Sequence, residues 1–441
     1  MHIHIIGISG TFMAGIASIA NAMNISVTGC DENTYPPMSD VLAEQGIGIT
    51  QGYGVQAFDK QPDMYVIGNA AKRGMPVIED ILTNKRPYIS GPEWLYQHVL
   101  RHKTVIAVSG THGKTTTSSL LAWTLECAGL SPSFLIGGAP RNFGISARAM
   151  DSELFVIEAD EYDTAFFDKR SKMVHYRPDI ALVNNLEFDH ADLFEDMHAI
   201  QKQFHGMLRV IPEQGVIVCP SEIESVDELL AMGTWSKVVR FNHVSGLHAT
   251  LINADGSQFD VLQGAEILAR ISWDLIGWHN VQNALAVFAV CISLNIDIHD
   301  IERAFKTFKS VKRRLELKKI INNVRIYDDF AHHPTAIQST VNGLRAKIKE
   351  EAFIAIVDFG SHTMRSGLFF KEILKAVESA DLALFLNAPT RGATDIPLNV
   401  LLCDSIKELE QAIKHFGRTQ HVLVMSNKAN QYVLEKLNTL F

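Results

Sequence analysis

Short β-branched runs alternate with longer segments of helical periodicity along the whole chain, which predicts an α/β protein. The first run occupies residues 2–7. It is followed by a turn rich in glycine and serine, a helix rich in alanine, and a second run at residues 25–28 that leads to Asp31. This order is typical of a dinucleotide-type βαβ unit, which has a strand, a glycine turn, a helix, a second strand and then an acidic residue. The further strand-like runs of this first block lie at residues 64–67 and 87–89.

Two longer blocks with the same alternation follow. The second begins with a β-branched strand at residues 104–108, and its segment 215–273, which contains short alternating strands, predicts an antiparallel appendage. The third block predicts a doubly wound parallel sheet, with strands at residues 324–327, 353–357, 382–386 and 422–425. We therefore expect three domains, at residues 1–102, 103–309 and 310–441.

The composition restricts the classes of function. With 441 residues, of which 47% are hydrophobic, the chain can bury several cores. Its 49 acidic and 40 basic residues give a net charge of −9, which provides no basic field for nucleic acid or a membrane surface. The five cysteines are scattered without a Cys-x-x-Cys pair and suit neither a disulfide framework nor a cysteine zinc site. Since no apolar run reaches the roughly 20 residues that cross a bilayer, we expect a cytoplasmic protein without nucleic-acid or membrane partners.

The strongest chemical signal is a glycine-containing loop between a strand and a helix. Residues 109–117 read Ser-Gly-Thr-His-Gly-Lys-Thr-Thr-Thr, although Gly110 and Gly113 are closer together than in the general Walker pattern. Glycines let the backbone turn so that its N–H groups and the positive end of the helix dipole face phosphate oxygens. Lys114 would reach the outer phosphates and Thr115 would bind Mg²⁺ through its hydroxyl. The alternative is an exposed turn that happens to contain Gly and Lys, and the flanking strand and helix argue against it.

Acidic residues and a histidine follow the next two predicted strands. Glu158 ends the first of these strands and is the expected metal ligand, since the carboxyl ends of strands form the ligand-binding edge of open α/β sheets. Three acids come directly behind it, Asp160, Glu161 and Asp163. A solvated loop with helix-capping acids explains them at least as well as a direct role in the site. His190 follows the second strand. Alone it would be a histidine hydrogen-bonded to its neighbouring Asp, but beside the loop and Glu158 a metal-binding role is favoured.

Together with later motifs, this loop resembles that of the Mur ligase family, whose hallmark is Gly-Thr-x-Gly-Lys-Thr. The resemblance covers essentially the whole chain, and its motifs appear in the family's order at Gly110–Thr115, Gly277–Asn283, Arg313–Arg314 and Asp328–Pro334. It implies a Rossmann-like N-terminal domain for a UDP-sugar, a central P-loop ATPase-type domain and a doubly wound Rossmann-like C-terminal ligase domain. It also implies ATP and Mg²⁺ as cofactors.

The resemblance further implies the residues of each site. The implied catalytic residues are Lys114, His190, Arg314 and Asp329. The implied ATP-binding residues are Gly110, Thr111, His112, Gly113, Lys114, Thr115, Thr116, Asn280, Asn283, Arg314 and Asp329. The implied metal ligands are Thr115, Glu158 and His190. The implied UDP-sugar-binding residues are Gly7, Ser9, Gly10, Thr11, Phe12, Met13, Asp31, Asn69 and Ser90, on a turn that departs from Gly-x-Gly-x-x-Gly.

Elementary chemistry agrees with several of these assignments. Asn280 and Asn283 are one helical turn apart and so face the same way, and Arg314 is a permanent cation suited to phosphate. The structural alternatives are that the asparagines cap a helix, that Arg314 is a surface residue, and that Asp329 lies in a turn before a proline. The adjacent His332 and His333 do not face one ligand easily and are interpreted as structural.

Within the family, the chain resembles the branch that recycles murein tripeptide. The resemblance implies that ATP activates UDP-N-acetylmuramic acid as an acyl phosphate, and that the amine of L-alanyl-γ-D-glutamyl-meso-diaminopimelate is then joined to it. The alternatives are an alanine-adding ligase of peptidoglycan synthesis, a nucleotide-dependent switch, and a folate-type polyglutamylating ligase, which should lack the first domain. Residues 358–363 and 428–431 depart from the recycling branch where the peptide is expected to bind.

Overall fold

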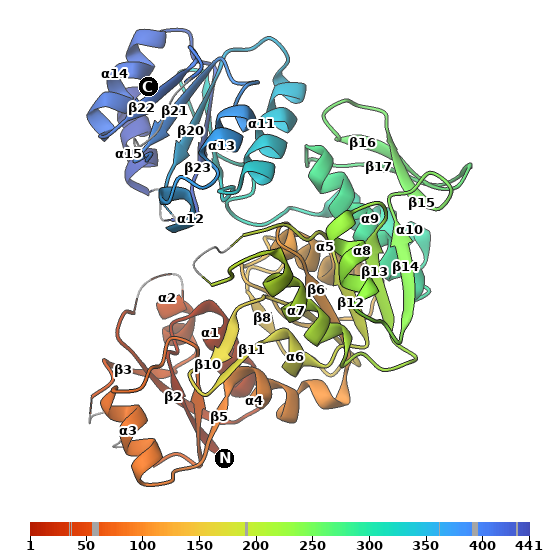
Figure 1. Cartoon of the computed structure of the whole chain (residues 1–441), viewed down its shortest axis with the longest axis vertical. Coiled ribbons are helices and arrows are strands. Elements are labelled where there is room, and N and C mark those ends of the chain that lie inside the picture. The colour runs from red at the N-terminus through yellow and green to blue at the C-terminus, as the bar shows by residue number, and fades with distance from the viewer. Residues whose placement is uncertain are drawn as a thin grey trace.

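The computed structural model describes residues 1–441 except 35, 37, 55–60, 190–192, 361, 390–395 and 429–430, and the side chain of residue 362. Three large sheets follow one another along the described chain, and Figure 1 shows the colour passing from the first block through the central one to the third. Most neighbouring strands within them are parallel, which confirms the predicted α/β class. No described helix has the length and apolar character needed to cross a membrane.

The first sheet has five parallel strands in the order β3-β2-β1-β4-β5. This is the arrangement in which a Rossmann-like unit places its ligand at the carboxyl ends of the central strands. One strand, β3, was not predicted from the sequence. The strands are β1 (His2–Ile6), β2 (Ser26–Asp31), β3 (Gly48–Gln51), β4 (Met64–Ile67) and β5 (Tyr88–Ser90). The helices are α1 (Thr11–Ala22), α2 (Met38–Glu44), α3 (Pro76–Thr83) and α4 (Gly91–His98), followed by the 3-10 turn Leu100–His102.

The central sheet has ten strands in the order β17-β16-β15-β14-β13-β12-β6-β9-β7-β8. The prediction of an antiparallel appendage at 215–273 was partly wrong, because β13 and β14 continue the parallel sheet and the antiparallel pairing begins only between β15 and β16. The strands are β6 (Thr104–Ser109), β7 (Ser133–Leu135), β8 (Ala147–Arg148), β9 (Leu154–Glu158), β12 (Ile180–Val183), β13 (Val216–Pro220), β14 (Lys237–Phe241), β15 (Leu247–Leu251), β16 (Gln258–Gln263) and β17 (Glu266–Ser272). A separate hairpin consists of β10 (Asp163–Ala165) and β11 (Asp168–Ser171). The helices are α5 (Lys114–Cys127), α6 (Met173–Tyr176), α7 (Met197–Leu208), α8 (Glu224–Ala231), α9 (Trp278–Ser293) and α10 (Ile298–Thr307).

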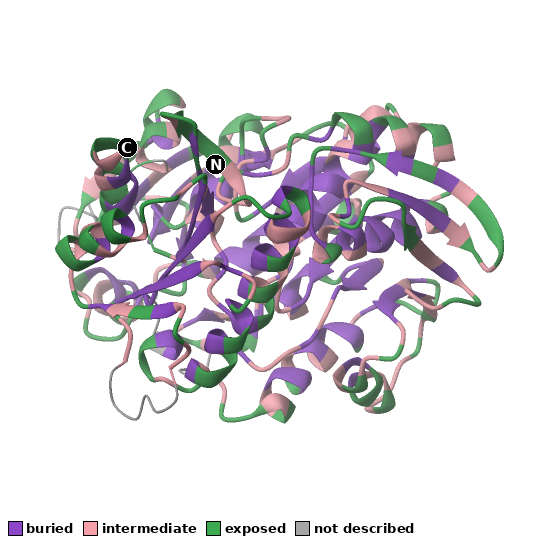
Figure 2. Cartoon of the chain, turned by 90° about the horizontal axis from the view of Figure 1, so that it is seen from above, coloured by how far each residue is buried: buried purple, intermediate pink, exposed green. Residues whose placement is uncertain are grey.

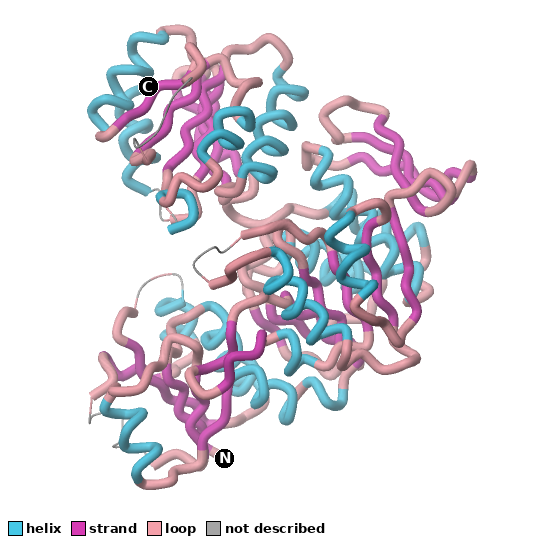
Figure 3. The backbone as a smooth tube through the Cα atoms, in the orientation of Figure 1, coloured by secondary structure: helices cyan, strands magenta, loops and turns pink. Residues whose placement is uncertain are grey.

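The third sheet has six strands in the order β18-β19-β23-β20-β21-β22. All pairs are parallel except β18 with β19 at one edge, so the predicted doubly wound sheet is present with an added antiparallel edge strand. The strands are β18 (Glu316–Ile321), β19 (Val324–Asp329), β20 (Phe353–Asp358), β21 (Leu382–Leu386), β22 (Val400–Cys403) and β23 (His421–Met425). The helices are α11 (Pro334–Ile348), α12 (His362–Arg365), α13 (Phe370–Ala376), α14 (Ile406–Phe416) and α15 (Gln431–Leu440). Figure 3 shows these helices around the strands of the sheet.

The first two blocks share a hydrophobic core, whereas the third has its own. Buried residues of α1 and of β6, β7 and β9 belong to one cluster, and a Cβ on Gly15 of α1 would lie 2.1 Å from Leu135 Cδ1 of β7. Among the described residues, the two clusters of the third block contain only one from before the junction, Ile276. Figure 2 shows the buried positions concentrated on the strands. The third block is therefore the part whose position depends least on apolar packing.

Candidate active site

The predicted phosphate loop joins β6 to α5 and needs glycine at two positions. Gly110 and Gly113 have φ of +135° and +78°, in the range that L side chains rarely adopt. A Cβ on Gly113 would lie 2.6 Å from Asn283 Oδ1, and one on Gly110 would lie 3.1 Å from the backbone of Asn185. The helix begins at Lys114 without a side-chain cap. Among the described residues no side chain caps the first N–H groups of this helix, which leaves them suited to an anion.

Lys114 is held in the loop by two of the acids that follow β9. Its ammonium lies 2.9 Å from Glu161 Oε2 and 3.3 Å from Asp160 Oδ1, and only 12% of the lysine side chain is exposed. Burial disfavours the charged ammonium, but the negative charges of Glu161 and Asp160 outweigh this effect and raise the pKa of Lys114 well above its ordinary value. Sequence reasoning found a solvated loop at least as good an explanation of these acids, because nothing local in the sequence pairs them with a lysine 46 or 47 residues earlier.

Glu158 lies at the carboxyl end of β9, directly beside the loop. Its Oε1 accepts a hydrogen bond from Thr115 Oγ1 at 2.9 Å, and its Oε2 accepts one from the backbone N–H of Gly137 at 2.7 Å. A carboxylate and a hydroxyl that meet in this way form a hard oxygen set of the kind that Mg²⁺ prefers. The third expected ligand, His190, lies outside the described residues.

Asparagines from two elements meet behind the loop. Asn283 of α9 accepts a hydrogen bond from Asn184 at 2.7 Å and donates one to Asn280 at 3.4 Å, so the predicted pair does share one face of the helix. Asn280 also donates to the carbonyl of Ile276, which lies just before the helix begins. Sequence reasoning did not select Asn184 or the adjacent Asn185, although their place at the end of the strand β12 was a usable signal.

Asp329 and Arg314 lie where the third block approaches the central one, since burial together with the charge of Arg314 lowers the pKa of His279 on α9. The Asp329 carboxylate accepts hydrogen bonds from the backbone N–H groups of Leu315 at 2.6 Å and Ala331 at 2.7 Å. Burial raises the pKa of Asp329, while the charge of Arg314 and these hydrogen bonds oppose the rise. The Arg314 guanidinium lies 5.3 Å from the centre of the Phe330 ring. Asp329 thus holds the turn on which Arg314 is presented.

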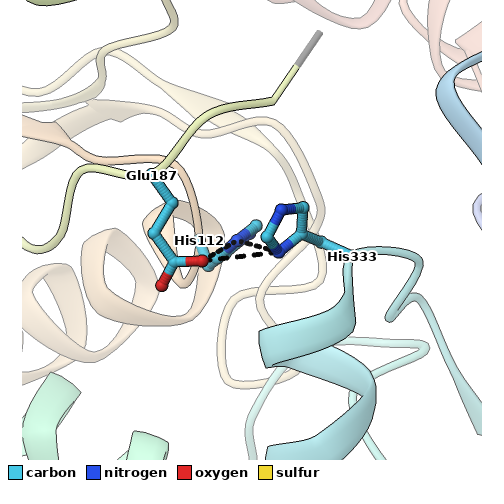
Figure 4. Close-up of side chains that lie close together, drawn as sticks. All are labelled: His112, Glu187 and His333. Carbon is cyan, nitrogen blue, oxygen red and sulfur yellow. Dashed lines mark hydrogen bonds and ion pairs between the residues drawn. The ribbon is translucent and has the colours of Figure 1, made fainter. Parts of the chain in front are cut away.

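A second contact between the central and third blocks joins the phosphate loop to the start of α11. His112 of the loop and His333 lie beside Glu187, which follows β12, and Figure 4 shows the three side chains pointing toward one another. Burial alone would raise the pKa of Glu187, but the hydrogen bond and charge of His112, with contributions from Thr335 and His333, lower it to about 2. The neighbouring His332 turns elsewhere, with its Nδ1 2.9 Å from the carbonyl of Phe330. Sequence reasoning interpreted both histidines as structural and did not connect His333 with the loop.

The glycine turn of the first block is shaped by the acid at the end of β2. Gly7 has a φ of +80°, and Asp31 accepts hydrogen bonds from the N–H of Ser9 at 2.8 Å and from the hydroxyl of Tyr53 at 3.3 Å. The hydroxyl of Ser9 is buried and has no hydrogen-bond partner among the described residues. The helix α1 then begins after Gly10 without a side-chain cap. These features leave polar groups of the turn available to an anionic ligand.

The remaining predicted UDP-sugar residues differ in their surroundings. The chain places Thr11, Phe12 and Met13 in the first turn of α1, where the ammonium of Lys172 lies 5.3 Å from the centre of the Phe12 ring. Ser90 accepts the N–H of Glu93 and so caps α4, and Asn69 is exposed. A cavity of about 530 Å³ opens near Asp31, and its lining includes Tyr53, Lys72 and Arg73.

One of the segments that depart from the recycling branch begins at a buried acid of the third sheet, Asp358. Asp358 at the end of β20 accepts hydrogen bonds from Asn387 at 3.1 Å, from the hydroxyl of Ser426 at 3.1 Å and from that of Tyr432 at 3.3 Å. This carboxylate is therefore occupied by contacts within the third block. Residues 361 and 429–430 of these segments lie outside the described part of the chain.

Comparison with known proteins places all three blocks in one family. The profiles described as "Mur ligase family, catalytic domain", "Mur ligase middle domain" and "Mur ligase, glutamate ligase domain" match residues 2–103, 108–291 and 313–428. The chain is 45% identical to a UDP-N-acetylmuramate--L-alanyl-gamma-D-glutamyl-meso-2,6-diaminoheptandioate ligase from Haemophilus influenzae, over 99% of both chains. It is 40% identical to a murein peptide ligase from Psychrobacter arcticus whose crystal structure superposes with a TM-score of 0.74, over 99% of this chain and 98% of that one. A UDP-N-acetylmuramate--L-alanine ligase from Desulforapulum autotrophicum is more distant, with 30% identity over 92% of this chain and 88% of the relative.

Proposed function

The chain belongs to the Mur ligase family, and from this premise we propose that it joins the tripeptide L-alanyl-γ-D-glutamyl-meso-diaminopimelate to UDP-N-acetylmuramic acid at the expense of ATP. The single observation that carries the proposal is the 45% identity, over essentially the full length of both chains, to a relative that bears this name. The alanine-adding relative has a lower identity to this chain, so an alanine-adding activity is the weaker alternative. The proposed role is in peptidoglycan recycling, in the cytoplasm.

We assign the ATP site to the loop between β6 and α5. The backbone from Gly110 to Thr116 would surround the phosphates, with the ammonium of Lys114 neutralising the outer ones. Asn280 and Asn283 would contact the rest of the nucleotide. The oxygen pair of Thr115 and Glu158 fits Mg²⁺, which would neutralise phosphate charge when bound.

The reaction then follows from positioning and charge neutralisation. The lactyl carboxylate of UDP-N-acetylmuramic acid attacks the γ-phosphorus, the bond to the β-phosphate oxygen breaks, and ADP leaves. The peptide amine attacks the resulting acyl carbon, a proton leaves the nitrogen, and inorganic phosphate is released. Lys114 and Arg314 would stabilise the charge that develops on the transferred group. His190 or Asp329 would take the amine proton, although Asp329 already accepts two backbone hydrogen bonds.

The first block would bind the UDP-sugar at its glycine turn. The unpartnered hydroxyl of Ser9 and the uncapped start of α1 are donors suited to a diphosphate. We also propose the domain boundaries after residues 102 and 309, since the three sheets occupy residues 2–90, 104–272 and 316–425. The peptide would bind at the carboxyl edge of the third sheet.

Phosphate release by the purified full chain tests the function. With ATP, Mg²⁺ and UDP-N-acetylmuramic acid, we expect release to require the tripeptide and to be much slower with L-alanine at the same concentration. Faster release with L-alanine would establish the alanine-adding reaction instead. Release with ATP alone, unchanged by either substrate, would indicate a nucleotide-dependent switch.

A further inference from the structure

The contact between the phosphate loop and the third block has the geometry of a metal site. The ligand atoms His112 Nε2, His333 Nδ1 and Glu187 Oε2 are separated by 3.0, 3.5 and 3.4 Å. Ligands about 2.0–2.1 Å from a tetrahedral ion are about 3.3–3.4 Å apart, so the three atoms already lie close to one face of such a tetrahedron. One ion would require only small side-chain shifts to bind all three.

The contacts behind the ligand atoms orient them for this role. His333 Nε2 lies 3.2 Å from the carbonyl of Phe188. Because a carbonyl only accepts, the imidazole proton must be on Nε2, and the lone pair of Nδ1 then points at the cluster. Thr335 Oγ1 donates a hydrogen bond of 2.7 Å to Glu187 Oε2. Histidine and carboxylate ligands that are fixed by hydrogen bonds to a carbonyl and a hydroxyl are the usual arrangement in protein metal sites.

We propose that His112, Glu187 and His333 bind one divalent transition-metal ion of the Zn²⁺ class, at a site distinct from the one assigned to Mg²⁺. Two imidazole nitrogens and one carboxylate oxygen select Zn²⁺ or a similar borderline ion, whereas Mg²⁺ prefers oxygen ligands alone. The side chain of Glu187 is 33% exposed, so water can reach the fourth position. The ligand Glu158 of the assigned Mg²⁺ site belongs to a different group of contacts, with Thr115 and the backbone of Gly137.

The ion would connect two blocks that share little apolar packing. His112 and Glu187 belong to the central block, while His333 is the residue before α11, 221 positions after His112. In the described cores, a single residue from before the junction, Ile276, belongs to the clusters of the third block. A metal bridge at this place would hold the third block against the phosphate loop without nucleotide.

Cobalt provides a direct test, because Co²⁺ replaces Zn²⁺ and has intense visible absorption only in tetrahedral sites. The full chain, freed of metal with a chelator and kept without nucleotide, is titrated with Co²⁺ and then with Zn²⁺ as competitor. We expect one equivalent of tetrahedral Co²⁺, displaced by one equivalent of Zn²⁺ and not by excess Mg²⁺. Each of H112A, E187Q and H333A should weaken Co²⁺ binding by about 100-fold or more, beyond the usual cost of losing a supporting contact.

Two control variants keep the result specific. H299A removes a histidine whose side chain is 90% exposed on α10 and whose ion-pair partner is Glu302, and it should bind Co²⁺ like the unmodified chain. E158Q removes the assigned Mg²⁺ ligand and should leave the tetrahedral spectrum in place. E187Q preserves the shape of the side chain, so the test survives if a histidine variant fails to fold.

The proposal is overturned by any of three results. These are the absence of tetrahedral absorption at one equivalent, a spectrum that E158Q removes, and equal Co²⁺ affinity in E187Q and the unmodified chain. The absorption does not depend on ligase turnover, so a failure here is distinguishable from a failure of the proposed function.

Discussion

Replacing Gly113 with alanine tests whether the phosphate loop is held by the asparagines behind it. The residue has a φ of +78°, and its Cβ would lie 2.6 Å from Asn283 Oδ1 and 2.9 Å from Asn184 Nδ2. These two atoms are the acceptor and donor of the 2.7 Å hydrogen bond between Asn184 and Asn283. The new methyl group cannot be accommodated unless that hydrogen bond is broken or the loop moves.

The same helix provides a matched control, because Gly129 just beyond its C-terminus has a φ of +77° and would meet nothing within 4 Å of a Cβ. G129A therefore carries only the cost of alanine in the left-handed region, about 1–2 kcal/mol. G113A carries that cost together with about 1–3 kcal/mol for buried amide groups that lose their partner. We expect the free energy of unfolding to fall by about 2–5 kcal/mol in G113A, clearly more than in G129A.

Tryptophan fluorescence during urea unfolding measures this difference in the relevant block. Four of the five tryptophans lie at residues 123, 235, 273 and 278, all in the central block, so the signal reports mainly on that part of a multidomain chain. Nucleotide affinity measured by calorimetry should fall in G113A and stay unchanged in G129A. Equal losses of stability in the two variants would show that the loop does not depend on the asparagine contact.

Three further variants address other parts of the molecule. K114A should slow phosphate release by about 100-fold or more while calorimetry detects unchanged UDP-sugar binding; full activity would mean that the site is elsewhere. The pKa of Asp168 is lowered to about 2, chiefly by the hydrogen bond from Arg170. This ionised carboxylate therefore stabilises the folded chain above the unfolded pKa of about 3.9, and the stabilisation is lost as the pH falls toward 2. D168N should therefore flatten the dependence of the unfolding free energy on pH in that window, and an unchanged slope would contradict the assignment. G15V places a side chain against Leu135 across the first two blocks and should cost about 1–3 kcal/mol, whereas a calorimetric transition identical to that of the unmodified chain would refute the shared core.

Local patterns were sufficient where structure and chemistry depend on neighbouring residues. The motif Gly110–Thr115 connects a strand to the start of a helix as predicted, because glycine conformation, helix start and strand propensity are all local properties. The same holds for Glu158 at the end of β9 and for Asn280 and Asn283 on one face of α9. The loop and Glu158 needed only periodicity and the rule that ligand sites lie at the carboxyl ends of strands, whereas Asn280 and Asn283 were selected by the resemblance to the Mur ligases and only their shared face followed from periodicity.

Contacts between distant segments were beyond the same reasoning. The choice of Glu161 and Asp160 as partners of Lys114 depends on how β9 lies beside β6, and the pairing of His112 with His333 depends on how two blocks approach each other. The antiparallel segment was placed too early because short strands with alternating residues look alike whether their partners are parallel or antiparallel. The chain direction of β13 and β14 follows from the helix between them, α8, which was not recognised.

The pairing of charges around the loop also explains why the nucleotide should enter together with a cation. Lys114 is neutralised by Glu161 and Asp160, and Glu158 is held by a hydroxyl and a backbone N–H. A triphosphate that arrives alone must displace the carboxylates from Lys114. It then lies beside three acidic side chains, and the repulsion between these negative charges is strong in a partly buried site. A triphosphate that arrives with a divalent cation exchanges partners instead, because phosphate replaces the carboxylates on the ammonium while the carboxylates gain the cation. Preference for the metal complex over the free anion therefore arises from the acids that follow β9, which the loop sequence by itself does not contain.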